Sequence, residues 1–528
     1  MSEKTEKVIS SSAASDGSPA VGEIHDLAGD GVNNNVHLSR VLGSRHLVFF
    51  SIGSSIGLGL WLGSGTALAR GGPAALFLAF CWASSVVFAV TQATGELAVM
   101  YPVPSAFPQW AGKFIDTAPA VTLGWSYWFA ATMSVASELT GLVTVLHYWT
   151  SAVPTAAWIS IFLALLIFLN AFNVKVFGEA EVFMSALKLG WMVIVIIVCI
   201  VISAGGGPIP ERTGFRYWNE ELFTNGFKGF LAVLPTCVFS MGGSEISGLS
   251  AAEAKNPLKA VPRAVSSIWL RLGLFYVLGS LMTTIVVSPH NPDLFGASGV
   301  NASPYVIAFH NAGLPGLAYA MNVIILISVF SCGNGLAYAA SRIPFGMAKI
   351  GLVPKFLGWA DKSGRPWPGL AMTFAVGGGL AYLNVSTGSA TVFTWLMSLT
   401  TLCILFNWSI ICLSHIRFRR AWAKQGHTAE ELPWQMPFYP YTSYYGLACC
   451  IIMFVVDFYL AVWPLGLVPS ARNFFSRFLS GIALLVLYIV AKIYFRGRLY
   501  IKSEDVDLDT RRAHYSRDLE VEAATKST

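Results

Sequence analysis

The chain has 528 residues, of which 55% are apolar and only 12% are charged, and its mean hydropathy is +0.60. Soluble domains carry about 25% charged residues, so this composition excludes an ordinary soluble enzyme and a disordered chain. The net charge is only +6, and the basic residues lie in loops and tails rather than in one patch, which excludes a nucleic-acid-binding protein. The eight cysteines fall inside apolar stretches without metal-ligand spacing, so we expect small apolar core residues and no metal site.

Both ends of the chain are polar. Residues 1–45 are rich in Ser, Asn and Gly, and they lack the apolar run and the cleavage site of a signal peptide. We therefore expect 1–45 to be a disordered cytosolic tail. Residues 496–528 have a similar polar composition with mixed charge, and we expect a second cytosolic tail there. Residues 46–495 then form a membrane domain.

Between the tails, the sequence contains apolar stretches that are long enough to cross a bilayer. A helix needs about 20 residues to cross about 30 Å of hydrocarbon. The stretches lack the alternation of barrel strands, and each span must satisfy its own backbone groups, so we expect helices. The twelve predicted spans are 46–68, 74–99, 119–149, 155–173, 182–204, 229–250, 264–288, 317–341, 367–385, 391–414, 441–463 and 474–495.

The distribution of Lys and Arg predicts the orientation of these spans. With a cytosolic N-terminus and twelve spans, the tails and the even-numbered loops hold most of the 34 basic residues, and few lie in the opposite loops. Both termini are therefore expected on the cytosolic side.

The first and sixth predicted spans contain many residues that weaken helices. The first carries five glycines between Gly53 and Gly65, and the sixth carries Pro235 followed by Gly242 and Gly243. Close packing of helices through small residues is one explanation. The alternative is that both helices are interrupted in the membrane.

The matching positions of these two spans favour interruption. They begin two five-span halves, residues 46–204 and 229–414, and paired interruptions are typical of inverted-repeat transporters with a site at the membrane midplane. We therefore expect an all-α polytopic membrane protein with a five-plus-five inverted repeat, discontinuous helices 1 and 6, and extra helices at 441–463 and 474–495. At such breaks, N–H groups at the positive end of a half-helix bind a carboxylate and freed carbonyls bind an ammonium, so the site suits a zwitterion.

Several ionisable side chains lie at membrane depth, where an unpaired charge costs at least about 2.5–3.5 kcal/mol. Glu138, Lys188 and Glu245 lie deepest, and we expect functional roles for them, with an ion pair between helices as the alternative. A structural role is expected for those near span ends or outside the ten-helix core, which are Glu96, His147, Arg271 and Asp457.

Eight ordered blocks of the sequence resemble the fungal amino-acid permeases, the yeast amino acid transporter family of the amino acid–polyamine–organocation superfamily. The similarity extends from about residue 38 to residue 500. The blocks are IGLGLWLGSGTAL (Ile56–Leu68), GELAVMYPVPSAF (Gly95–Phe107), ELTGLVTVLHYW (Glu138–Trp149), FGEAEVFMSALK (Phe177–Lys188), FSMGGSE (Phe239–Glu245), EAKNPLKAVPRA (Glu253–Ala264), SCGNGLAYAASR (Ser331–Arg342) and SHIRFRRAW (Ser414–Trp422).

The resemblance implies a LeuT-like fold whose substrate site is built from both breaks. The segment Ser55–Gly59 matches the loop that holds the α-carboxylate, and Ser240–Ser244 matches the loop whose carbonyls take the α-ammonium. Phe239 matches an aromatic residue that closes over the substrate, and Thr394 and Trp395 fall near the side-chain pocket. The residues implied to bind substrate are Ser55, Gly57, Leu58, Gly59, Phe239, Ser240, Gly242, Ser244, Thr394 and Trp395.

The same resemblance implies coupling to protons. Lys188 matches a lysine of the fifth span whose ammonium occupies the place of a sodium ion in sodium-coupled relatives. Glu245 matches a carboxylate implicated in gating or proton movement, and we add Glu138 as a further candidate for proton coupling. No cofactor is expected beyond the proton gradient.

The chain departs from the family pattern near the expected pocket. Leu58 replaces a small polar residue and Met241 replaces a Phe; Trp61 and Gly335 are further departures. A charged substrate side chain facing Leu58 would lose water without gaining a partner. We therefore expect a neutral, at least partly apolar substrate side chain rather than Lys or Arg.

We expect a secondary active transporter, not an enzyme, that takes up amino acids with protons across the plasma membrane by alternating access. Two alternatives remain: an exchanger or exporter of an amino acid-like metabolite, and a non-transporting amino-acid sensor on the same fold. The expected partners are the amino-acid substrate and the lipid bilayer, without nucleic acid. By analogy, ubiquitination and trafficking machinery would act at the cytosolic tails, where Lys4 and Lys7 are candidate acceptors.

Overall fold

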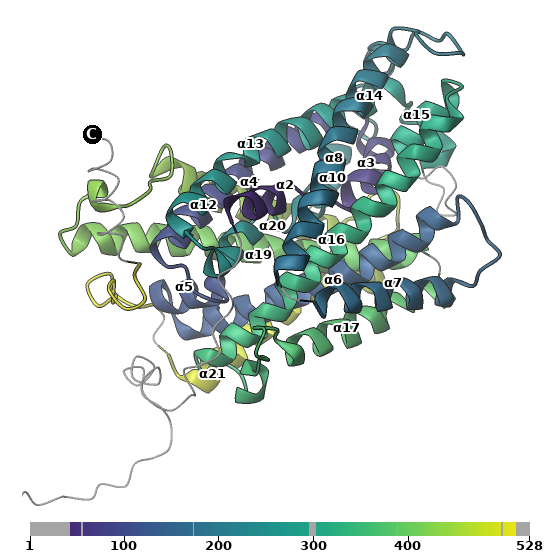
Figure 1. Ribbon diagram of the computed structural model, residues 1–528. Coiled ribbons are helices and arrows are strands. Elements are labelled where there is room, and N and C mark those ends of the chain that lie inside the picture. Colours follow the sequence, from purple (N-terminus) through teal and green to yellow (C-terminus); the bar gives the residue numbers. More distant parts are fainter. Residues whose placement is uncertain are drawn as a thin grey trace, which may run out of the picture.

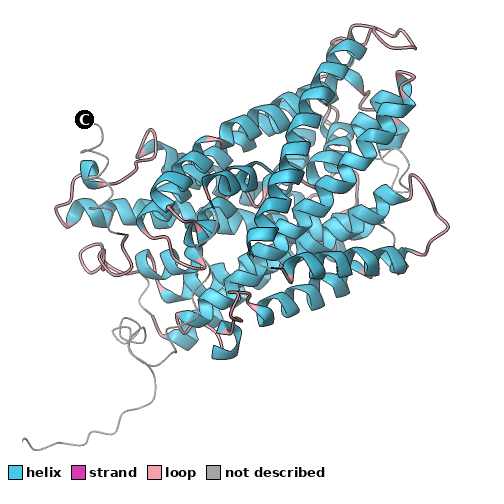
Figure 2. Cartoon of the chain, viewed as in Figure 1, coloured by secondary structure: helices cyan, strands magenta, loops and turns pink. Residues whose placement is uncertain are grey.

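The structure is a computed structural model of the chain, and it describes residues 43–53, 56–172, 174–294, 303–387, 389–497 and 500–513. All regular secondary structure within these ranges is helical (Figure 2). The expected all-α architecture is therefore confirmed. Ser55, Lys4 and Lys7 lie outside the described residues, as does most of the expected N-terminal tail.

The first expected span is interrupted. Helix α2 (Ser44–Gly53) ends before the break, and the chain becomes helical again in the π-helical turn η1 (Gly59–Gly63), which continues into α3 (Ser64–Gly71). Gly72 then adopts φ 83°, a left-handed conformation that glycine reaches without steric cost. This residue separates α3 from α4 (Pro73–Met100).

Long apolar helices make up most of the remaining chain. Within the described ranges, nine helical segments are long and apolar enough to cross a membrane. In chain order they are α4, α6 (Thr117–Leu146), α8 (Val174–Ser203), the run α12 (Pro257–Ser266), α13 (Ile268–Arg271), η3 (Leu272–Leu278) and α14 (Gly279–Val286), α16 (Pro315–Lys349), α17 (Trp367–Ala381) with α18 (Asn384–Thr387), α19 (Ser389–Lys424), α20 (Tyr441–Val462) and α21 (Ala471–Phe495).

The remaining expected spans are shorter or broken. Helix α7 (Thr155–Asn170) has 16 residues, and α10 (Gly226–Met241) has the same length. After a break, α10 is followed by the short helices α11 (Ile246–Leu249) and η2 (Ser250–Glu253). The total of twelve spans therefore stays a prediction.

Helix α6 lies inside the bundle, where it packs along α16 and α19 and also contacts α5, α17 and α21 (Figure 1). Its sequence is rich in Ala, Ser, Thr and Gly, which allow close approach of helices in membranes. Every residue from Ala130 to Val143 is buried. This helix forms one wall of the space between the two broken spans.

The outward faces of several helices are strongly apolar. Phe183 on α8, Val455 on α20 and Ile493 on α21 are 71%, 60% and 69% exposed. Soluble monomers rarely expose apolar surface on this scale, whereas a lipid environment accepts it. Together with the nine long apolar helices, these faces identify a multi-pass membrane protein.

Short helices cover both ends of the bundle. We call the end at which α2 begins and α4, α16 and α19 finish the basal end. Beside it lie α5 (Ala106–Phe114), η5 (Lys355–Gly358) and η6 (Ala429–Glu431). The opposite end carries α9 (Arg216–Glu220), η4 (Pro292–Leu294) and α15 (Pro304–Asn311).

Part of the expected C-terminal tail is docked at the basal end. Tyr101 donates a hydrogen bond to the Leu508 carbonyl at 2.7 Å, and the N–H groups of Ile501 and Ala513 donate to carbonyls of the α4–α5 region at 2.9 Å. Val506 and Leu508 are buried. Residues 500–513 are therefore ordered against the bundle, because two apolar side chains and several backbone groups find partners there.

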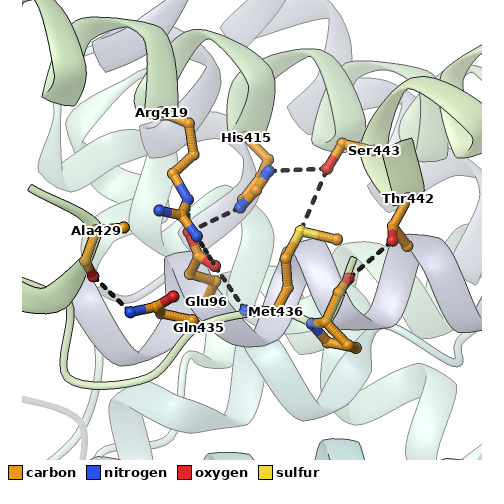
Figure 3. Close-up of polar contacts among 9 residues, drawn as sticks. Glu96, His415, Arg419, Ala429, Gln435, Met436, Thr442 and Ser443 are labelled. Atoms are coloured by element: carbon orange, nitrogen blue, oxygen red, sulfur yellow. Dashed lines mark hydrogen bonds and ion pairs between the residues drawn. The ribbon is translucent and has the colours of Figure 1, made fainter. Parts of the chain in front are cut away.

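A charged cluster joins three segments at the basal end (Figure 3). Glu96 of α4 forms an ion pair with Arg419 of α19 at 2.6 Å, and it lies 3.0 Å from His415 Nε2. The backbone N–H of Met436 donates to the same carboxylate at 2.7 Å, and Ser443 of α20 lies 2.9 Å from His415 Nδ1. Glu96 therefore has a structural role in tying α4 to α19 and to the loop before α20.

Candidate functional site

The break in the first span brings the backbone close to α6 and α16. A Cβ atom on Gly57 would lie 2.3 Å from Glu138 Oε1 and 2.7 Å from Cys332 Sγ, so only glycine fits without displacing these side chains. The Leu58 N–H donates to the two Glu138 oxygens at 3.3 and 3.1 Å. Glu138 thus accepts from a backbone N–H at the start of the second half-helix, one that would otherwise lack a partner.

The break in the sixth span lies against the first. Helix α10 contains Pro235 and ends at Met241, and Gly243 adopts φ 85° before α11 begins. A Cβ atom on Gly59 would lie 2.7 Å from Ser240 Cα. Contact between the two backbones therefore requires glycine at this position.

A cavity of about 490 Å³, its open mouth included, lies between the two breaks, α6, α16 and α19. The lining residues are Gly57, Gly59, Tyr127, Ala130, Ala131, Ser134, Glu138, Phe239, Ser240, Gly242, Gly243, Glu245, Cys332, Leu336, Ile404 and Asn407.

Two buried carboxyl groups from different segments of the chain line this cavity. Glu138 of α6 is held by Leu58, as described above, and Glu245 follows the sixth-span break. Trp408 Nε1 donates to Glu245 Oε2 at 3.0 Å, and Tyr127 lies next to Glu245 in the lining. The cavity is therefore bordered by two carboxyl groups as well as by backbone N–H groups.

Lys188 of α8 is fully buried behind the first break. Its Nζ donates to the Gly53 carbonyl and to Ser331 Oγ at 2.8 Å, and it lies 3.5 Å from the Ile56 carbonyl. The ammonium thus connects the end of α2 to α16 and takes up carbonyls that the interruption leaves without helical partners. An ion pair between Lys188 and Glu245, the alternative noted from the sequence, is not formed in this arrangement.

The structure brings together half of the expected substrate-binding residues. Gly57, Gly59, Phe239, Ser240 and Gly242 line the cavity, as do the two carboxylates. The Phe239 ring also meets Phe393 edge to face, with centroids 5.6 Å apart.

Three expected residues lie beside the cavity rather than on its surface. The Leu58 side chain faces α6, since a Cβ atom on Gly141 would lie 2.4 Å from its Cδ1. Met241 is buried but is not part of the lining. Ser244 accepts from Arg271 Nη2 at 2.5 Å. The argument for a neutral substrate from Leu58 and Met241 therefore has no direct contact to support it.

Thr394 and Trp395 lie away from the cavity, which corrects the expectation for α19. Both are exposed, and Trp395 is 37% exposed. Thr394 precedes Ile404 by ten residues, or about 15 Å along a helix. Ile404 and Asn407, further along the same helix, line the cavity instead.

Sequence reasoning missed several polar residues of the site. Asn407 is buried, and its Oδ1 has no hydrogen-bond partner although it borders the cavity. Glu181 is buried on α8, seven residues before Lys188 and therefore on the same helix face. That spacing, together with a carboxylate inside an apolar run, was the available signal.

Two further ionisable residues at membrane depth, Arg271 and Asp457, have structural partners. Arg271 is fully buried and donates to the Ser51 carbonyl at 2.6 Å and to Ser244, so it joins α2 to the sixth-span break. Asp457 of α20 pairs with Arg477 of α21 at 3.0 Å. Among the residues that the structure describes, no three His, Cys, Asp or Glu side chains converge on a metal site.

Comparisons with known proteins agree with this architecture. The sequence model described as "Amino acid permease" matches residues 46–501. Amino-acid permease GAP3 of Candida albicans is 38% identical over 486 residues, which cover 91% of this chain and 81% of that protein. General amino-acid permease GAP1 of Saccharomyces cerevisiae is 38% identical over 492 residues, which cover 91% and 82%. Cationic amino acid transporter 1 of Schizosaccharomyces pombe is 38% identical over 469 residues, which cover 88% and 80%.

The fold is also similar to the crystal structure of a manganese transporter from Eremococcus coleocola, with a TM-score of 0.51 over 88% of this chain and 99% of that chain. The two sequences are 14% identical, so this likeness concerns the fold alone. The relatives named above are permeases and transporters from fungi, not enzymes. The resemblance first seen in the eight sequence blocks is thereby confirmed: the chain belongs to the amino acid permease family.

Proposed function

We propose that this protein is a proton-coupled symporter that moves amino acids across the plasma membrane by alternating access. The observation that carries the proposal is the position of Lys188. Its buried Nζ bridges the broken first span and α16, directly behind the cavity. A titratable group that holds the substrate-binding break in shape provides a link between proton binding and substrate binding.

The proposed substrate is the zwitterionic part of an amino acid. The N–H groups at the start of the η1 half-helix, near Gly57 and Gly59, suit the α-carboxylate. Carbonyl groups of the sixth-span break suit the α-ammonium, although the Ser240 carbonyl already accepts from Tyr276 at 2.8 Å. Phe239 lies over this space and is in place to cover a bound molecule.

The proposed coupling follows from the contacts of Lys188. The charged ammonium donates to the Gly53 carbonyl and to Ser331, and it fixes α2 relative to α16. Loss of its proton weakens these charge-assisted hydrogen bonds and frees α2 to move away. Proton and substrate then stabilise the same arrangement of the break, and each strengthens binding of the other by the same factor.

The side-chain end of the cavity favours a neutral amino acid. Apolar side chains of Ala130, Ala131, Leu336 and Ile404 line the cavity together with the amide of Asn407, and the Glu138 and Glu245 carboxyl groups border the same space. We propose a neutral substrate side chain because the apolar lining offers a charged group no partner away from these two carboxyl groups. One relative is named a general permease and another a cationic transporter, and both are 38% identical to this chain. Their names therefore do not decide between neutral and cationic substrates, and the proposal rests on the cavity lining.

The proposal includes the full topology expected from the sequence. It has twelve spans, a five-plus-five inverted repeat and two cytosolic termini, so the basal end faces the cytosol. Lys and Arg at the ends of α16 and α19 support this orientation, since Lys349 and Lys424 lie there. A tag on either terminus should be protected in intact cells, and an accessible N-terminus would contradict the topology.

Uptake of each radiolabelled amino acid, measured in cells that lack their own permeases, tests the proposed function. We expect accumulation of neutral amino acids against a gradient, faster at external pH 5 than at pH 7 and abolished by a protonophore. Uptake that depends on internal amino acid but not on pH would instead identify an exchanger. Saturable binding without uptake would identify a sensor.

A further inference from the structure

A buried hydrogen-bonded chain leads from Lys188 to a second carboxylate. Lys188 Nζ donates to Ser331 Oγ at 2.8 Å, and the Ser331 hydroxyl donates to Glu181 Oε2, also at 2.8 Å. All three side chains are buried, at 1% exposure or less. The lysine and the carboxylate are thus joined through one hydroxyl group, which can accept a proton on one side and release its own on the other.

The far side of Glu181 points toward the basal end through two amides. Asn334 Nδ2 donates to Glu181 Oε1 at 3.3 Å, and Asn170 Nδ2 donates to Asn334 Oδ1 at 2.9 Å. Asn170 then lines a second, small cavity of about 270 Å³, its open mouth included. The other lining residues are Phe172, Phe177, Tyr338, Arg342, Arg365, Pro366 and Leu370. Only the two amide side chains separate Glu181 from this space along the hydrogen-bonded chain.

We infer that Glu181 is the residue that receives the proton from Lys188, through Ser331, and passes it to water in the second cavity. This inference rests on the proposed proton coupling. The Lys188 ammonium gives one proton to Ser331 Oγ while the Ser331 hydroxyl gives its proton to Glu181 Oε2. The lysine becomes a neutral amine, and the carboxylate becomes a neutral acid. Glu181 then releases the proton to water, which carries it away as hydronium, so charge and atoms balance.

The two asparagines position the carboxylate rather than carry the proton. Amide N–H groups do not titrate in this range, and Asn170 is itself fixed by the Leu166 carbonyl at 3.0 Å. Movement of α7 relative to α16 would separate Asn170 from Asn334 and admit water to Glu181. In that arrangement, water reaches Glu181 from the second cavity, while Lys188 and Ser331 separate Glu181 from the binding cavity.

Between Lys188 and the second cavity, Glu181 is the only carboxylate among the described residues that can accept the proton without already pairing with an arginine. Glu138 of α6 and Cys332 of α16 face Lys188 from the side of the binding cavity. At the second cavity, Arg342 pairs with Glu253, and Arg365 pairs with Asp361. Glu179, two residues before Glu181, lies on the outside and pairs with Arg45 and His46.

Glu181→Gln tests the inference, with Glu179→Gln as the matched control on the same helix. Ser331→Ala interrupts the route at a second point, and Ser331→Thr restores the hydroxyl. Each purified full-length variant is placed in liposomes containing a pH-sensitive dye, and a mixture of the twenty radiolabelled amino acids is the probe. Two quantities are measured: net uptake driven by an inward proton gradient, and exchange of external for internal amino acids without a gradient.

We expect Glu181→Gln to lose at least tenfold of proton-driven net uptake and of dye response, while exchange stays within about twofold of wild type. Ser331→Ala should lose net uptake at least tenfold as well, and Glu179→Gln and Ser331→Thr should behave as wild type. Wild-type net uptake by Glu181→Gln or by Ser331→Ala would overturn the inference. If the wild-type protein itself shows no proton-driven uptake, the proposed function fails instead, which the same assay separates from failure of the route.

Discussion

Two regions of the molecule bury a carboxylate together with a cation, and they are built differently. In the basal cluster, Glu96 contacts Arg419 directly at 2.6 Å and accepts from the Met436 N–H as well (Figure 3). Near the binding cavity, Lys188 and Glu181 are joined only through the Ser331 hydroxyl. The first pair lies between continuous helices, whereas the second borders a broken helix and lies between two cavities.

We call the basal cluster a clamp, because its direct ion pair holds the helices together. The contact through Ser331 allows the charges on Lys188 and Glu181 to change. A directly paired charge with every oxygen occupied is costly to rearrange, because either partner alone would be left uncompensated. A pair joined through a hydroxyl can exchange a proton without moving heavy atoms far. We therefore assign buried charge a stabilising role at the basal end and, on the proposed mechanism, a role in proton transfer near the cavity.

The largest expected effect comes from breaking the basal clamp. Arg419→Met leaves the buried Glu96 without its direct ion pair, which should cost about 3–5 kcal/mol of the free energy of unfolding. The neighbouring Arg420 is exposed and contacts Tyr444, so Arg420→Met is the matched control. Thermal unfolding in detergent should show a clear drop for Arg419→Met and little for the control. Equal unfolding temperatures would show that the cluster is not a clamp.

Closing the first-span break should abolish transport without unfolding the protein. The Cβ of Gly57→Val would overlap Glu138 and Cys332 and stiffen the backbone at the cavity. Gly243→Val should act similarly, since φ 85° is strained for a β-branched residue. Gly190→Val on α8 is the control, because no atom lies near its added Cβ. Uptake and surface abundance are measured together; normal affinity in both break variants would reduce these glycines to packing roles.

A moderate effect is expected for the amide in the binding cavity. Asn407→Leu removes the buried Oδ1 that faces the cavity without a partner. Neutral substrates with a hydrogen-bond donor on the side chain should lose about tenfold in kcat/KM relative to leucine or valine. Asn384→Leu provides the comparison, since Asn384 is buried outside the cavity. An unchanged preference in Asn407→Leu would remove Asn407 from the substrate site.

The smallest expected effect concerns pH at the docked C-terminal segment. Burial and the nearby Arg511 lower the pKa of Lys113 from 10.5 to about 8, while Asp507 and Asp509 act in the opposite direction. The docked state thus binds fewer protons than the undocked state between pH 8 and pH 10.5, so docking should strengthen as pH rises through that window. The mobility of a spin label at the exposed residue Asp509 reports docking.

Lys113→Met should remove this pH dependence of docking, because no proton is then released at that position. Lys502→Met, on the segment itself, leaves Lys113 in place and should retain it. A label that becomes more mobile from pH 7.5 to pH 9.5 in the wild-type protein would contradict the stated sign.

The all-helical, multi-pass membrane architecture could be predicted from the sequence because its signals are strong and local. Long apolar runs are required because each span must satisfy its own backbone groups in lipid. The paired glycine-rich segments mark the two spans in which the helix is interrupted. The residues of the breaks, such as Gly57 and Gly242, were identified for the same reason.

The parts that sequence reasoning missed depend on distances between helices. Thr394 and Trp395 are in the expected span, but helix rotation and depth place Asn407 at the cavity instead. Leu58 is next to two site glycines, yet its side chain faces α6. Residues 500–513 look like a polar tail, and their docking depends on Tyr101 after α4, Lys113 of α5 and Gln425 after α19, which no local pattern brings together.

Proton and amino-acid fluxes measured together in liposomes test the central claim most directly. The comparison is wild type, Lys188→Met and the control Lys492→Met, whose lysine on α21 pairs with Asp116 at the start of α6. The account predicts that wild type and Lys492→Met carry protons inward with amino acids and accumulate them against a gradient. Lys188→Met should fold and reach the membrane but show neither proton flux nor accumulation. Accumulation by Lys188→Met with the wild-type pH profile would contradict the account.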